Sequence, residues 1–184
     1  MEASAPRRRR FRGTLFDALA HTILFAILAC SGSEASPDRL CIFDFDETLW
    51  IRATNSVAEE ARRVVRACVR SGYEIAIATV NPFPLHVRRV LQEEISEALF
   101  PTELLLSPAF QFGRRNKTVA MNLILRYYGM QDAPECAVLF DDNELANKPH
   151  ADATGVHWIL VDETIGITMD DFDRAEQKLD RFCP

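Results

Sequence analysis

The five cysteines of the sequence include no C-x-x-C pair, and this absence argues against a structural zinc site. Cys41 and Cys136 lie in apolar, strand-like runs, so we expect both to be buried thiols. A disulfide framework is therefore not expected, although the sequence leaves a single bridge open.

Low-complexity segments and a basic domain are also absent. Seven glycines and nine prolines in 184 residues are too few for a low-complexity chain, and no internal repeat is visible. Residues 1–30 have a net charge of +3 and the whole chain has −6, which leaves −9 on residues 31–184. Because nucleic-acid binding needs a basic surface, this acidic body argues against a nucleic-acid partner.

The most apolar run of the sequence lies near the N-terminus and follows the basic cluster Arg7–Arg10. The run from Ala18 to Cys30 is shorter than the roughly 20 residues of a membrane span, and small residues follow it. We expect residues 1–37 to be a targeting segment and linker. Export or membrane anchoring through residues 7–30 is favoured, and an organelle presequence or a plain extension of a cytosolic protein remains open.

Residues 38–184 read as one domain in which apolar, strand-like runs alternate with amphipathic helices. This alternation predicts an α/β fold with a central parallel sheet covered by helices on both faces. Strands are expected at 40–45, 74–79, 102–107, 136–140 and 157–161. Helices are expected at 55–71 with a capping box at Ser56 and Glu59, at 84–99, at 116–128, from 143 with an interruption near Pro149, and after the cap Thr168.

Polar side chains follow the predicted strands, at the sheet edge where ligands bind in such folds. They are Asp44 and Asp46 after the first strand, Thr79 and Asn81 after the second, Lys117 at a helix start, and Asp141 and Asp142 after the fourth strand. Parallel strands end at one edge, so we expect these groups to converge. Crowded carboxylates repel one another, and a bound cation relieves the repulsion. An all-oxygen site suits Mg²⁺, and the hydroxyl and ammonium suit a phosphoryl group beside it.

Each of these residues has an ordinary structural role when it is taken alone. A single acid, threonine or lysine at such a position is more often a capping, turn or surface residue, and Glu47 is interpreted as a solvated acid. The order of all the motifs together, each at its expected strand end or helix start, argues for a site. Trp50 and Phe83 could line the entrance, but core packing is expected for both.

This order of motifs resembles that of the haloacid dehalogenase (HAD) superfamily. Asp44–Thr48, Thr79, Lys117 and the pair Asp141 and Asp142 correspond to its four motifs. The segments "DFDETLW" and "LFDDNELAN" are most similar to the magnesium-dependent phosphatase family. The resemblance covers about residues 39–181 and implies a Rossmann-like, five-stranded parallel sheet.

The resemblance also implies a two-step hydrolysis of phosphomonoesters. Asp44 would attack phosphorus to form an aspartyl-phosphate, and Asp46 would act first as acid and then as base. Asp44, the backbone carbonyl of Asp46, Asp141 and Asp142 would hold Mg²⁺. The phosphoryl group would be bound by the three residues Thr79, Asn81 and Lys117.

No segment of the sequence is long enough for the cap module of this superfamily, so an open, capless site is expected. That suits a phosphoprotein, such as one with phosphotyrosine, or a small sugar or aryl phosphate. A phosphoacceptor domain, a non-catalytic adaptor with the same fold, and a membrane-anchored glycosyltransferase using Asp44 and Asp46 remain alternatives. The sequence leaves the substrate, the oligomeric state and a membrane association through the N-terminal segment open.

Overall fold

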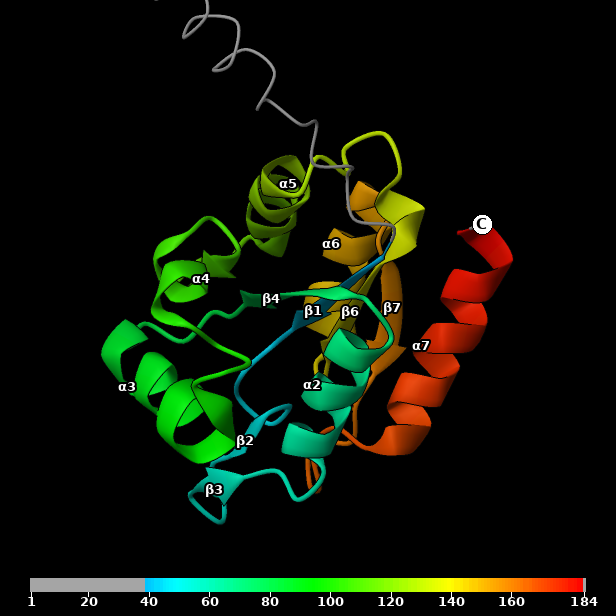
Figure 1. Ribbon diagram of the computed structural model, residues 1–184. Coiled ribbons are helices and arrows are strands. Elements are labelled where there is room, and N and C mark those ends of the chain that lie inside the picture. The colour runs from blue at the N-terminus through cyan, green and yellow to red at the C-terminus, as the bar shows by residue number, and fades with distance from the viewer. Residues whose placement is uncertain (1–38, 184) are drawn as a thin grey trace, which may run out of the picture. The chain divides into compact units, whose positions relative to one another are not determined.

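A computed structural model describes residues 39–183 of the chain (Figure 1). The predicted targeting segment, residues 1–37, lies outside the described residues, so its nature stays a prediction. No helix within residues 39–183 is long and apolar enough to cross a membrane.

Five parallel strands form the central sheet in the order β5-β4-β1-β6-β7 (Figure 1). The strands are β1 (Leu40–Phe43), β4 (Glu74–Ala78), β5 (Phe110–Gln111), β6 (Ala137–Asp141) and β7 (His157–Leu160). In the centre of the sheet, Phe43 of β1 pairs with Ile77 of β4 and with Phe140 of β6. The predicted α/β class and parallel sheet are confirmed.

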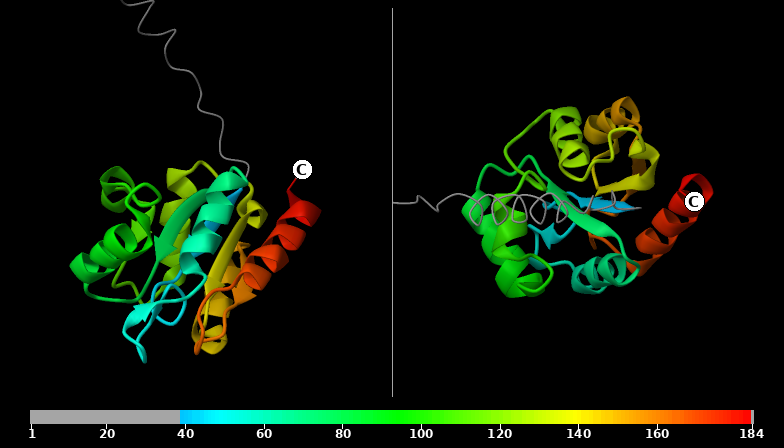
Figure 2. Two further views of the ribbon diagram at one scale, coloured as in Figure 1. Left: turned by 60° about the horizontal axis from the view of Figure 1, so that its bottom comes forward. Right: turned by 45° about the horizontal axis from the view of Figure 1, so that its top comes forward.

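Helices cover both faces of this sheet (Figure 2). They are α2 (Ala61–Arg70), α3 (Pro84–Arg89) continued by the π-helix η1 (Val90–Ser96), α4 (Thr102–Leu106), α5 (Lys117–Tyr127), the 3-10 helix η2 (Pro134–Cys136), α6 (Glu144–Thr154) and α7 (Met169–Phe182). Helices α5 and α6 pack on one face, and α2 and α7 pack on the other.

Alternate residues of β1 point into two separate cores, as the two-residue period of a strand requires. Cys41 and Phe43 pack in the core on the side of α2 and α7, while Leu40 and Ile42 pack on the side of α5 and α6. The rings of Phe43 and Phe140 stack at 5.2 Å between centroids. This packing makes the central strands a rigid support for the residues that follow them.

The predicted strand over residues 102–107 is wrong. The segment forms the short helix α4, which starts directly after Pro101, and the edge position of the sheet is taken by β5. A short apolar run such as "TELLLS" satisfies strand and helix periodicity equally, and only its position in the fold decides between them.

The predicted start of the helix over 55–71 is also wrong. Residues 50–57 form a small antiparallel hairpin of β2 (Trp50–Ile51) and β3 (Ser56–Val57), and α2 begins only at Ala61. Asn55 adopts a φ of 51° in the hairpin turn, a conformation that asparagine tolerates better than most residues. The expected capping box is therefore absent, and the N-cap residue Glu60 makes no side-chain cap.

Two further expectations are corrected. Helix α6 runs through Pro149 without the predicted interruption. Cys136 is not a free thiol, because it forms a disulfide with Cys183 that ties the end of α7 to the start of β6. Cys41 is a buried free thiol, as expected.

Candidate active site

The predicted site residues lie at the carboxyl ends of β1, β4 and β6. Asp44 follows β1 directly, and its backbone N–H donates to the carbonyl of Phe140 at 2.9 Å, which continues the parallel ladder. Thr79 follows β4 and donates its N–H to the carbonyl of Gln111 at 2.9 Å. Asp141 is the last residue of β6, the strand next to β1. The sheet register therefore brings Asp44 and Asp141 together.

Lys117 is the fully buried centre of this group. It is the first residue of α5, whose N-cap Asn116 accepts a hydrogen bond from the N–H of Val119. Its Nζ lies 3.0 Å from Asp44 Oδ2 and also contacts Asp141 Oδ2. Burial by itself would lower the pKa of Lys117, but the charges of Asp44 and Asp141 outweigh it and raise the pKa. Lys117 is therefore a permanent cation between two carboxylates.

Asp141 is oriented by two asparagines that were not predicted as site residues. Its Oδ1 accepts hydrogen bonds from the backbone N–H of Asn143 at 2.8 Å and from the side chain of Asn147 at 3.0 Å. Asn147 is a buried asparagine inside α6, one turn beyond the N-cap Asn143. A buried amide on the helix that follows the acid pair is the signal that could have identified it.

A cation fits the remaining carboxylate oxygens. Asp44, Asp141 and Asp142 each offer an oxygen, and these oxygens lie within 4.8 Å of one another. Asp44 Oδ1 is buried without a hydrogen-bond partner within the described part of the chain, which is costly for a carboxylate oxygen. Burial and the charges of Asp44 and Asp141 raise the pKa of Asp142 to about 6. A hard divalent cation removes all of these penalties at once.

Asp46 lies just outside this cluster and is held by Asn81. The side-chain amide of Asn81 donates to both carboxylate oxygens of Asp46, at 3.2 and 3.0 Å. The amide oxygen of Asn81 in turn accepts the N–H of Phe83 at 2.9 Å, which fixes the amide's orientation. Burial raises the pKa of Asp46, the Asn81 hydrogen bonds lower it, and the charge of Asp44 raises it, with a raised pKa as the result. The phosphate-binding role predicted for Asn81 stays a prediction.

The hydroxyl of Thr79 is buried beside these groups. Its Oγ1 accepts the backbone N–H of Asn81 at 3.1 Å, so the hydroxyl hydrogen can be donated elsewhere. This arrangement suits a hydroxyl that donates to an anion at the sheet edge.

The two aromatic residues near the site have different surroundings. Trp50 is buried, stacks on Phe45 at 6.3 Å and meets the edge of His86, so it is part of the core, as expected. Phe83 is 67% exposed, so the expectation of core packing is wrong for this residue. Glu47 lies outside the carboxylate cluster, but its side chain is only 15% exposed and pairs with Arg52, so its interpretation as a solvated acid is wrong.

No protein-family model and no curated protein matches this chain by sequence. Solved structures match it by fold. A putative 3-deoxy-D-manno-octulosonate 8-phosphate phosphatase from Vibrio cholerae has a TM-score of 0.52 and 17% identity, over 79% of this chain and 87% of that one. The chain therefore shares the α/β fold of that solved structure.

Two more solved structures share this fold. The N-terminal part of a Bacteroides fragilis protein, which contains a phosphatase domain complexed with Mg, has a TM-score of 0.56 and 17% identity, over 90% of this chain and 46% of that one. An uncharacterized protein from Listeria monocytogenes serotype 4b has a TM-score of 0.51 and 15% identity, over 71% of this chain and 82% of that one. At such identities the likeness establishes the fold and not the reaction.

Proposed function

We propose that this chain is a Mg²⁺-dependent phosphomonoester hydrolase with Asp44 as its nucleophile. The observation that carries the proposal is the buried Asp44 carboxylate, which has one oxygen on Lys117 and the other without a partner among residues 39–183. A carboxylate fixed beside a cation and a second acid two residues away fits phosphoryl transfer. Structural relatives named as phosphatases, one of them complexed with Mg, support the same assignment.

In the first step, an oxygen of Asp44 forms a bond to phosphorus and the ester oxygen leaves. Asp46, whose raised pKa favours its protonated form, gives its proton to the leaving oxygen. Lys117 and the hydroxyl of Thr79 stabilise the phosphoryl charge. The products of this step are the free alcohol and an aspartyl-phosphate on Asp44.

In the second step, Asp46 accepts a proton from water as the water oxygen bonds to phosphorus. The bond between phosphorus and Asp44 breaks, which releases inorganic phosphate and restores both acids. Asp44, Asp141, Asp142 and the backbone carbonyl of Asp46 would hold Mg²⁺. When bound, the ion supplies positive charge against the phosphoryl oxygens and the acid cluster.

The substrate class follows from the surroundings of the site. The described chain folds without a separate cap domain, so the sheet edge is open to a phosphoprotein or a small sugar or aryl phosphate. Val80 and Phe83, which follow Thr79, are 40% and 67% exposed. An aryl ring such as that of phosphotyrosine could pack on them, which favours aromatic phosphoesters.

The decisive experiment is hydrolysis of p-nitrophenyl phosphate with Mg²⁺, after chelation, and in Asp44→Asn. We expect turnover in the native chain only when Mg²⁺ is present, and none in Asp44→Asn. Asp173→Asn, a change of an exposed acid on α7, is the matched control and keeps its activity. Turnover that survives in Asp44→Asn would falsify the proposal.

A phosphoacceptor domain or a non-catalytic adaptor is the alternative. The same preparations, treated with acetyl phosphate and analysed by intact mass, distinguish a phosphoacceptor from a hydrolase. A phosphorylated Asp44 that persists without release of phosphate favours the phosphoacceptor, whereas turnover favours the hydrolase.

A further inference from the structure

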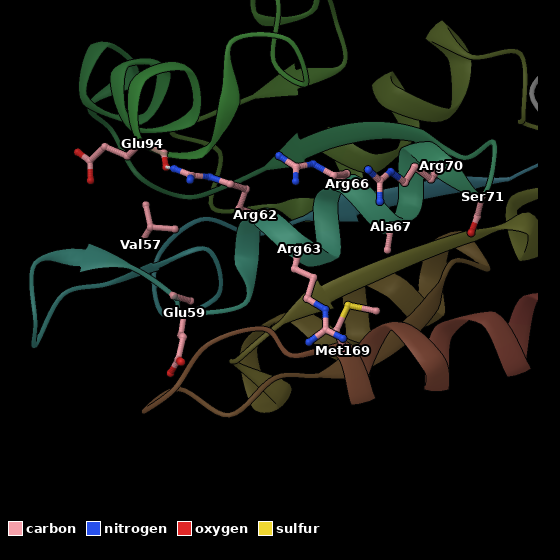
Figure 3. A pocket seen from close by; sticks show the side chains of 11 residues that line it. Val57, Glu59, Arg62, Arg63, Arg66, Ala67, Arg70, Ser71, Glu94 and Met169 are labelled. Carbon is pink, nitrogen blue, oxygen red and sulfur yellow. Dashed lines mark hydrogen bonds between the residues drawn. The ribbon is translucent and has the colours of Figure 1, made fainter.

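A groove of about 850 Å³ lies over the outer face of α2 and is also lined by residues of β3, η1 and the start of α7. It begins at Val57, Ala58 and Glu59 and continues along α2 to Ser71. Its apolar lining includes Ala67 and Met169, which lie on the side of α2 to which Arg63 points (Figure 3). The groove belongs to the outer surface of α2 and includes none of the acids proposed for catalysis.

Four arginines of α2 line this groove: Arg62, Arg63, Arg66 and Arg70. Two of them have structural partners. Arg62 donates to the carbonyls of Glu94 and Ile95, which fixes η1 against α2 as one wall of the groove. Arg63 pairs with Glu60 at 2.9 Å, and Glu60 also accepts the N–H of Met169 at the start of α7.

The other two, Arg66 and Arg70, are exposed, and no hydrogen bond or ion pair occupies either guanidinium within residues 39–183. They project from the same side of α2, whereas Arg63 points toward Met169 on the other side (Figure 3). Residues 31–184 carry a net charge of −9, so two unpaired arginines side by side in a groove stand out against an acidic body. Their charge is available to an anionic partner.

We infer that this groove binds a short, extended, acidic segment of a partner protein. Arg66 and Arg70 are separated by one helical turn, or about 6 Å along α2. Carboxylates two residues apart on an extended strand are about 6.6 Å apart, so a Glu-x-Glu pattern matches both guanidiniums.

Three other occupants fit less well. The basic residues 7–12 of this chain would be repelled by the arginines. A nucleic acid would continue past the groove over the surface of a body with a net charge of −9. A small anion alone would not fill an open groove in which the free guanidiniums are exposed and do not converge on one point.

The test is fluorescence anisotropy with a labelled peptide that has Glu at alternate positions and Ala or Val between them. Residues 7–12 hold five arginines, so every protein is a full chain in which these five are changed to Gln. The variant Arg66→Gln/Arg70→Gln is compared with Arg89→Gln/Arg126→Gln, which removes two exposed helix arginines outside the groove. The probe with Lys in place of Glu is the peptide control.

We expect saturable binding that weakens as salt rises, and about tenfold weaker binding in Arg66→Gln/Arg70→Gln, the effect of losing two surface ion pairs. The control variant should bind within twofold of the parent. Equal weakening in both variants, binding of the Lys peptide, or absence of binding overturns the inference. Tighter binding of a single-stranded oligonucleotide that depends on Arg66 also overturns it, because the occupant would then be a nucleic acid. A dimer that dissociates in Arg66→Gln/Arg70→Gln overturns it as well, because the occupant would then be a second copy of the chain.

Discussion

Asp46 takes part in both steps of the proposed reaction, and its effect on rate depends on the leaving group. Asp46→Asn removes the proton donor, so we expect turnover of an alkyl phosphate to fall by about 10²–10⁴-fold. Turnover of p-nitrophenyl phosphate, whose leaving group needs no proton, should fall less in the first step. Single-turnover kinetics on both substrates measures the difference. An equal loss on both would contradict a proton-donor role.

The raised pKa of Asp142 makes the free energy of unfolding depend on pH. Its pKa of about 6 lies above its ordinary value, so between roughly pH 4 and 6 the folded state binds more protons than the unfolded state. Stability from this residue is therefore present at acidic pH and is lost as the pH rises through 6. Without Mg²⁺, Asp142→Asn should be more stable than the parent at pH 7.5, and the advantage should vanish near pH 4.

Urea unfolding in the presence of a chelator, at pH values from 4 to 7.5, measures this difference. The exposed Asp173→Asn serves as the control and should show no such pH-dependent gain. A pH-independent effect of Asp142→Asn would mean that its carboxyl does not titrate differently in the folded chain.

At the scale of elements, the loop before α7 is packed against the loop after β1. Gly166 has a φ of +75°, and a Cβ there would lie 2.4 Å from Ala58 Cβ and 2.8 Å from the carbonyl oxygen of Thr48. Gly72 has a similar φ of +81°, but nothing lies within 4 Å of a Cβ at that position. Alanine substitutions at these two glycines therefore distinguish the cost of a left-handed backbone from the cost of a steric clash.

We expect Gly72→Ala to lower the free energy of unfolding by about 1–2 kcal/mol, the cost of the left-handed backbone alone. Gly166→Ala should cost about 1–3 kcal/mol more, because the added methyl group displaces the Thr48 loop. It should also reduce phosphatase activity, since that loop follows Asp46. Chemical denaturation of both variants checks the order, and equal losses would contradict the close packing.

At the scale of the whole molecule, the Cys136–Cys183 disulfide joins residues 47 apart in sequence. Removing a cross-link of this length from a native protein costs about 2–4 kcal/mol. We expect Cys183→Ser to lower the free energy of unfolding by that amount. Cys136 lies just before β6, at the end of the strand opposite Asp141, so phosphatase activity should be unchanged.

Reductant provides the control for this experiment. It should destabilise the parent to the level of Cys183→Ser and leave the variant unaffected. A parent chain that unfolds identically with and without reductant would contradict the bridge.

The sequence by itself determined the fold class and the chain order of the site. Apolar runs alternating with amphipathic helices require a parallel sheet, and residues after parallel strands meet at one edge. For this reason the sequence alone predicts that Asp44, Thr79, Lys117 and Asp141 lie together. Local chemistry also predicted the Thr168 cap of α7, which the structure confirms as a capping box.

Only the tertiary structure decided which distant groups touch. The amide of Asn81 on the Asp46 carboxylate, Asn147 on Asp141, and the Cys136–Cys183 bridge each join segments whose approach depends on packing. The same holds for "TELLLS", which became α4 because β5 occupies the sheet edge. Hydrophobic periodicity and the residues at strand ends are properties of short sequence segments. These contacts instead depend on how the helices pack against the sheet.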